Sequence, residues 1–345
     1  MNASISGDPV TTTALIRDVF LVDPVLSADF VFYIFCLIFA VCSLGVVTNV
    51  LNITVFIRQG LMDTVNISLL ALTVSELCSL LPLIGVGVLA DPRFLKTEYP
   101  IVGLEVQFLT ASGPHAFFTR ITGWITAYVM FERCVCVALP LRVRMIVTPQ
   151  TTVTCLVVIV VLVLAGIVPM YATHSLQWKF YPEANSTLLG LTLTTNAIDI
   201  TSVTNVLNNS VSAVCSFGVI FVCTCVIVVK LNRKSKWRTE VSLGKKKVDG
   251  NSFSSKDKRA IRVVTLISAI FLVSVAPSVV IVFVSSFYFE FSTLGKYRHL
   301  FYMTYSLTYA LEAVSASSNF IIYYKLNGKF RAVFLQMFSA THSKL

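Results

Sequence analysis

Charged side chains interrupt long apolar runs at a few positions of this sequence, and these are the residues whose types could do chemistry. They are Glu76, Arg120, Glu312 and the adjacent pair Glu132 and Arg133. A charge inside an apolar segment is costly to bury, so each one needs a partner or a function. Opposite charges can form a structural ion pair, or they can bind a polar ligand between them.

The whole chain has the composition of a membrane protein. Of its 345 residues, 56% are hydrophobic and 13% are charged, and the mean hydropathy is +0.80. Soluble domains carry about 25% charged residues. Seven apolar stretches are long enough to cross about 30 Å of hydrocarbon as helices, and none shows the two-residue alternation of a barrel strand. They cover approximately residues 30–57, 64–90, 101–138, 152–172, 207–230, 260–288 and 299–324.

The sequence therefore predicts an all-α fold, a seven-transmembrane helix bundle over residues 30–324, because backbone groups in lipid must bond within their own segment. Of the 27 Lys and Arg residues, 20 fall on one side of such a bundle and six on the other. This asymmetry predicts a plasma-membrane protein with an extracellular N-terminus (1–29) and a cytoplasmic C-terminus. The net charge of +10 is then explained by basic residues on the cytoplasmic side and by attraction to membrane lipid, not by nucleic-acid binding.

Two connections are long. Residues 173–206 form a polar outer segment and residues 231–258 a basic inner one, and both are expected to be irregular, mobile loops. After the seventh span, residues 325–338 carry apolar side chains at helical spacing, which predicts a short amphipathic helix on the cytoplasmic surface before a tail over 339–345. Glycosylation sequons on the predicted outer side begin at Asn2 and Asn185.

The sequence does not show the clusters of residues that other classes of protein need for their chemistry. The four histidines, at 115, 174, 299 and 342, form no cluster, and the nine cysteines lie in apolar segments without metal-ligand spacing. We therefore expect no enzyme activity, no metal site and no cofactor. The halves of the chain show no repeat and no ring of charges, so a polytopic transporter or channel is the weaker alternative.

Several motifs together resemble the rhodopsin-like (class A) G-protein-coupled receptors over about residues 30–338. They are Asn49 in the first span, "LALTVSE" in the second, "FER" with "LPL" after it, Phe271 before "AP" in the sixth, and "SNFIIYYKLNGKFR" at the end. The chain looks like a divergent invertebrate receptor and is similar to molluscan chemosensory receptor-like sequences. The resemblance implies a ligand-activated receptor that signals through a heterotrimeric G protein.

The resemblance assigns a switch to the inner ends of the helices. Arg133 would be held by Glu132 in the inactive state and would move toward the G protein on activation, together with Asn319 and Tyr323 of the seventh span. The alternative is that Glu132 and Arg133 only anchor the helix at the interface. Pro277 would kink the sixth helix, because proline lacks the N–H that an unbroken helix uses.

The resemblance also implies a polar network that in this family often holds a sodium ion, here a possible allosteric modulator. Its residues would be Asn49, Glu76, Thr122, Ser315 and Asn319.

The chain departs from the family pattern at three positions within motifs. Cys134 replaces a Tyr, Phe320 replaces a Pro, and Val275 replaces a Trp. The outer segments also lack the cysteine pair that normally fixes the outer lid.

The ligand is expected between the third and seventh spans. His115 stands where amine receptors carry Asp, which disfavours a biogenic amine. A cavity is predicted from His115, Arg120, Tyr305, Tyr309 and Glu312, and it would bind a small polar chemosensory compound, possibly zwitterionic, or a peptide end, as in a neuropeptide receptor. Arg120 and Glu312 could equally satisfy each other. Arrestin is a further candidate partner, through phosphorylation of Ser339, Thr341 or Ser343.

Overall fold

Long helices account for most of the structure, which is a computed structural model. It describes residues 23–89, 99–139, 142–182, 185–242, 255–292 and 295–342. The first half contains α2 (Pro24–Gln59), α3 (Thr64–Leu89), α5 (Gly103–Gln107), the π-helical segment η1 (Phe108–Ser112), α6 (Gly113–Ala138) and α7 (Val143–Ile146). The second half contains α8 (Pro149–Thr173), β1 (His174–Tyr181), β2 (Ser186–Leu193), α9 (Ala197–Thr204), the π-helical segment η3 (Asn205–Val211), α10 (Ser212–Ser242), α11 (Ser255–Phe287), α12 (Arg298–Leu326) and α13 (Gly328–His342).

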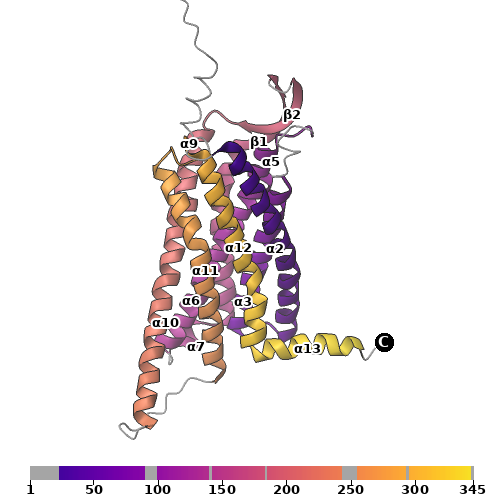
Figure 1. Cartoon of the computed structure of the whole chain (residues 1–345). Helices are drawn as coiled ribbons and strands as arrows, with labels where there is room; N and C mark the ends of the chain where they lie inside the picture. The colour runs from indigo at the N-terminus through magenta and orange to yellow at the C-terminus, as the bar shows by residue number, and fades with distance from the viewer. Residues whose placement is uncertain are drawn as a thin grey trace, which may run out of the picture.

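The long helices stand side by side as one bundle (Figure 1). In the described part of the chain, six helical segments are long and apolar enough to cross a membrane: Val25–Gln59, Thr64–Leu89, Gly103–Ala138, Pro149–Thr173, Val206–Lys230 and Arg259–Phe287. The seventh helix, α12, is less apolar because it carries many Ser, Thr and Tyr residues, but it packs against α2, α3 and α11 within the bundle. The predicted all-α bundle of seven spans is confirmed.

Local signals in the sequence explain where the helices begin. Asp23 Oδ1 accepts a hydrogen bond from the Val25 amide at 2.8 Å, and Pro24 occupies the first turn of α2. Thr148 and Thr151 form a reciprocal cap before α8, again with a proline in the first turn. The bundle then packs around two apolar clusters, one near Met130 and Tyr323 and the other near Leu83 and Ala313.

The two ends of the bundle carry different additions, which Figure 1 shows at the top and bottom of the view. We call the end with the β1–β2 hairpin the outer end and the end with α13 the inner end. At the inner end, α13 runs across the bundle axis and packs Phe330, Val333 and Phe334 against the core. The short helix expected over 325–338 therefore begins later, at Gly328, because Leu326 still belongs to α12.

Both long connections contain more regular structure than the sequence indicated. The outer segment is an antiparallel hairpin in which His174 faces Leu193 and Tyr181 faces Ser186, and it is followed by α9. The described residues of the inner segment, 231–242 and 255–258, are helical, since α10 runs to Ser242 and α11 begins at Ser255. The expectation of two irregular loops was wrong for these described residues, because polar composition alone does not exclude strands or helix extensions. Asn185 is exposed in the hairpin turn with φ of 44°, whereas Asn2 lies outside the described residues.

The hairpin is attached to the start of the third span without a disulfide. All nine cysteines lie in the described residues, and none of them forms a disulfide. Glu105 of α5 accepts hydrogen bonds from the Tyr181 hydroxyl at 2.9 Å and the Leu191 amide at 2.5 Å. Partial burial and the contact with Glu105 raise the pKa of Tyr181, which keeps the phenol a donor. A Cβ at Gly190 would collide with the Tyr181 hydroxyl and with Glu105 Oε2, so a larger residue here would displace the side chains that attach the hairpin.

The attachment predicts that Glu105→Ala loosens the hairpin. The substitution removes the acceptor of both bonds, and each bond contributes roughly 1 kcal/mol. We expect amide hydrogen exchange at Leu191 to accelerate by about tenfold, measured by mass spectrometry on the purified chain. Glu290→Ala, at an exposed position outside the hairpin, is the control. Unchanged exchange at Leu191 would contradict the attachment.

Candidate functional site

The Glu132 carboxylate joins three helices near the inner end of the bundle. It is fully buried on α6. Its Oε2 accepts a hydrogen bond from Ser68 of α3 at 2.8 Å, and its Oε1 accepts one from Thr152 of α8, also at 2.8 Å. Two hydroxyl donors satisfy the buried anion, as a carboxylate in a low-dielectric interior requires. Neither Ser68 nor Thr152 was predicted, because single hydroxyls on a helix carry no motif.

Arg133 forms an ion pair with the same carboxylate. The distance from its Nη2 to Glu132 Oε2 is 3.8 Å, and Arg133 is only 5% exposed. Its Nε has no hydrogen-bond partner among the described residues. The guanidinium is thus held by one long ion pair, whereas Glu132 is also held by two short hydrogen bonds. The arrangement keeps the carboxylate fixed and leaves the arginine as the partner that can exchange.

The Glu132 contacts predict an effect of Thr152→Val on stability. The substitution removes one donor and leaves a buried carboxylate oxygen unsatisfied, which costs about 1–3 kcal/mol. We expect the melting temperature of the purified protein to fall by several degrees. Thr154→Val, at an exposed position of α8, should leave it unchanged. Equal melting temperatures of the two variants would show that Thr152 does not support Glu132.

A second polar group lies deeper in the bundle around Glu76. Asn319 Nδ2 of α12 donates to Glu76 Oε1 at 2.5 Å, and Glu76 is 3% exposed. The other oxygen, Oε2, is buried with no hydrogen-bond partner among the described residues. Asn49 contacts α12 through the backbone instead, donating to Ala316 O at 3.0 Å. The structure therefore brings Glu76 and Asn319 together, with Asn49 joined to the same helix.

The remaining residues predicted for the network and the switch lie close by. Thr122 is hydrogen-bonded to Ser75 at 3.0 Å. Tyr323 is fully buried, with ring centroids 5.0 Å from Phe56 and 5.5 Å from Phe330. Pro277 lies inside α11. The contact with Phe330 of α13 couples the seventh helix to the helix on the inner surface.

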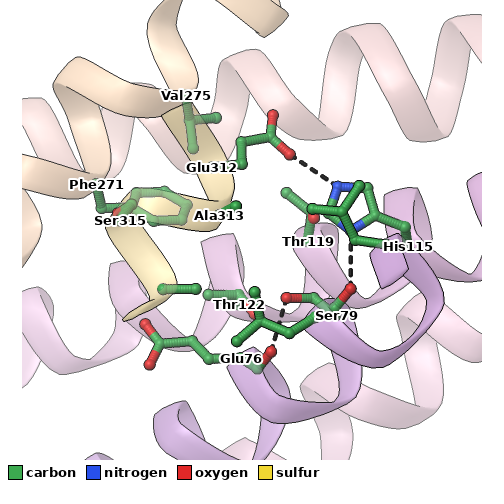
Figure 2. A pocket seen from close by; sticks show the side chains of 13 residues that line it. Glu76, Ser79, His115, Thr119, Thr122, Phe271, Val275, Glu312, Ala313 and Ser315 are labelled. Carbon is green, nitrogen blue, oxygen red and sulfur yellow. Dashed lines mark hydrogen bonds and ion pairs between the residues drawn. The ribbon is translucent and has the colours of Figure 1, made fainter. Parts of the chain in front are cut away.

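A cavity of about 20 Å³ opens above Glu76, between α3, α6, α11 and α12 (Figure 2). Its lining includes seven polar side chains that the figure labels: Glu76, Ser79, His115, Thr119, Thr122, Glu312 and Ser315. A cavity of this volume accommodates a water molecule or a small ion. The oxygen atoms of Glu76, Thr122 and Ser315 are hard ligands of the kind that small hard cations prefer, and Glu76 Oε2 is left without a partner. The residues present therefore fit a sodium ion.

His115 and Glu312 form a pair on the outer wall of this cavity. His115 Nε2 lies 3.0 Å from Glu312 Oε2, and its Nδ1 lies 2.9 Å from the Ser79 carbonyl oxygen. A carbonyl only accepts, so Nδ1 carries a proton. The second bond then needs one more proton, either on Nε2 or on the carboxyl group. In both arrangements the pair has no net charge.

Arg120 lies beside a different cavity, of about 10 Å³, between α6, α10 and α11. Glu312 pairs with His115, so the structure does not contain the direct Arg120–Glu312 ion pair that the sequence left open. Two aromatic rings pack edge-to-face behind the histidine, with ring centroids 4.9 Å apart for His115 and Tyr309 and 4.8 Å apart for Tyr309 and Tyr305. The five residues expected to face one cavity are therefore divided. His115 and Glu312 line the first cavity, Arg120 lines the second, and neither tyrosine lines either one.

The family follows from comparison with known proteins. The model of the family described as "Serpentine type 7TM GPCR chemoreceptor Srw" matches residues 36–341. The chain belongs to this family, and it is a multi-pass membrane receptor of the chemoreceptor type. The interpretation as a G-protein-coupled receptor with a chemosensory character is thereby confirmed, and the family is one of receptors, not enzymes. A search of curated proteins found no match.

Proposed function

We propose that the chain is a rhodopsin-like receptor of the plasma membrane that binds a small polar compound from outside and activates a heterotrimeric G protein. The observation that carries this proposal is the Glu132–Arg133 pair at the inner end. A buried carboxylate held by Ser68 and Thr152, beside an arginine held only at 3.8 Å, is a charge pair that can be exchanged for another partner. An interfacial anchor would not need a fully buried carboxylate.

The distribution of charge supports the orientation. The basic extension of α10 and the basic residues of α13 lie at the inner end (Figure 1), and by the positive-inside rule this supports a cytoplasmic inner end. The exposed Asn185 in the hairpin turn then lies outside the cell, where it would carry a glycan. The small cavities favour a small ligand over a neuropeptide. Arrestin would bind the phosphorylated tail, as a second partner.

The proposal predicts that Arg133→Ala abolishes signalling. The substitution removes the group that leaves Glu132 for the G protein. In cells that express the chain at equal surface levels, basal and extract-stimulated G-protein activation should fall to background. Phe131→Ala, two residues before Arg133 and exposed on the helix surface, should retain the signal. A response that survives Arg133→Ala would make the pair an anchor and would reopen the transporter or channel alternative.

The free oxygen of Glu76 predicts a sodium effect. A sodium ion bound by Glu76, Thr122 and Ser315 would stabilise the inactive bundle by mass action. We expect the melting temperature of the purified protein to rise when choline chloride is replaced by sodium chloride at the same ionic strength. Glu76→Gln should remove the difference, since the amide carries no charge. A sodium effect that persists in Glu76→Gln would place the ion elsewhere.

A further inference from the structure

Arg120 is a partly buried cation without a counter-charge in direct contact. Its Nε is buried without a hydrogen-bond partner among the described residues, and Glu312 is paired with His115 instead. Arg120 interacts with Tyr305 and Glu312 only at longer range. A cation withdrawn from water in this way is costly, and it persists where function requires it.

The other acidic groups of the bundle make their direct contacts elsewhere. The His115–Glu312 pair is neutral in either proton arrangement, as its two hydrogen bonds require. Glu105, at the outer end of the same span, is bonded to the hairpin. Glu76 is bonded to Asn319 and does not line the Arg120 cavity. Arg120 therefore has no anionic partner in its own cavity, and an anion bound there would balance its charge.

The lining of the Arg120 cavity indicates what kind of anion fits. Thr119 and Ser216 provide hydroxyl groups, whereas Phe217, Phe271, Val275 and Val279 provide an apolar wall. A guanidinium matches a carboxylate in charge and in its planar, two-pronged geometry. The apolar wall suits a hydrocarbon group attached to that carboxylate, and an inorganic anion would leave it unused. The cavity has the volume of about one water molecule, so binding must displace side chains of α10 and α11.

We propose that the ligand is a small organic carboxylate, whose anionic group pairs with Arg120 and whose apolar part packs between α6, α10 and α11. This inference rests on the proposed receptor function and specifies its ligand class. It revises the zwitterionic ligand expected from the sequence. Glu312, the group assigned to an amine, is already neutralised by His115.

A first experiment needs no ligand. Arg120→Met keeps an apolar stem of the side chain and removes the lone charge, so the melting temperature of the purified, unliganded protein should rise by about 2–4 °C. Arg133→Met is the matched control on the same helix. It removes a paired cation and strands Glu132, so its melting temperature should fall. A fall in both variants would show that Arg120 is structural and would overturn the proposal.

A second experiment measures binding directly on the purified chain with radiolabelled hexanoate. Unlabelled hexanoate should compete, whereas hexanamide and hexylamine, of the same shape, should not. Arg120→Met should weaken binding by at least about 30-fold, and Arg120→Lys should weaken it less. Phe131→Ala, at an exposed position of the same helix, should bind hexanoate as the wild type does.

Several results would overturn the proposal. They are equal competition by hexanamide, equal competition by chloride, undiminished binding by Arg120→Met, and no binding of hexanoate at all. Because this assay requires no G protein, such a result would leave the receptor function intact if Arg133→Ala still abolished signalling. If signalling survived Arg133→Ala while hexanoate binding still depended on Arg120, the proposed receptor function would fail and the assignment of the carboxylate ligand would stand.

Discussion

The cost of burying charge between membrane-spanning helices is the constraint on which the rest of this structure depends. Glu132 is fully buried, and hydrogen bonds from Ser68 and Thr152 and an ion pair with Arg133 offset the cost of its burial. The contact with His115 offsets this cost for Glu312, and the hydrogen bond from Asn319 offsets part of it for Glu76. All of these contacts except the Glu132–Arg133 pair join side chains from different helices, so the charged groups fix how the helices are rotated relative to one another.

The same constraint separates structural from functional charges. A pair whose members are both satisfied holds the bundle together. A group left incomplete marks a place where something else must bind, as with the second oxygen of Glu76 and the guanidinium of Arg120. Arg133 is only partly satisfied, because a single ion pair of 3.8 Å holds it. The three incomplete groups lie along the bundle from the ligand cavities to the inner surface, which is the direction in which a receptor transmits its signal.

Much of the fold could be predicted from the sequence, because membrane spans follow from length and hydropathy. The charged positions could be predicted as well, since a charge within an apolar run stands out. Their partners could not. Whether Glu312 meets Arg120 or His115 depends on the rotation of α6 and α12 by a fraction of a turn, which periodicity does not determine. Ser68 and Thr152 carry no motif, and the hairpin is held by Glu105 in place of the disulfide that the family would suggest.

The central claim is that Glu132 restrains Arg133 and thereby keeps the receptor inactive. The most direct test is agonist-independent nucleotide exchange by G proteins in membranes that contain the Glu132→Gln variant. The amide keeps the shape of the side chain but removes the charge that attracts Arg133. The account predicts a higher basal exchange rate than in wild-type membranes at equal receptor density, and an equal or lower rate would contradict it.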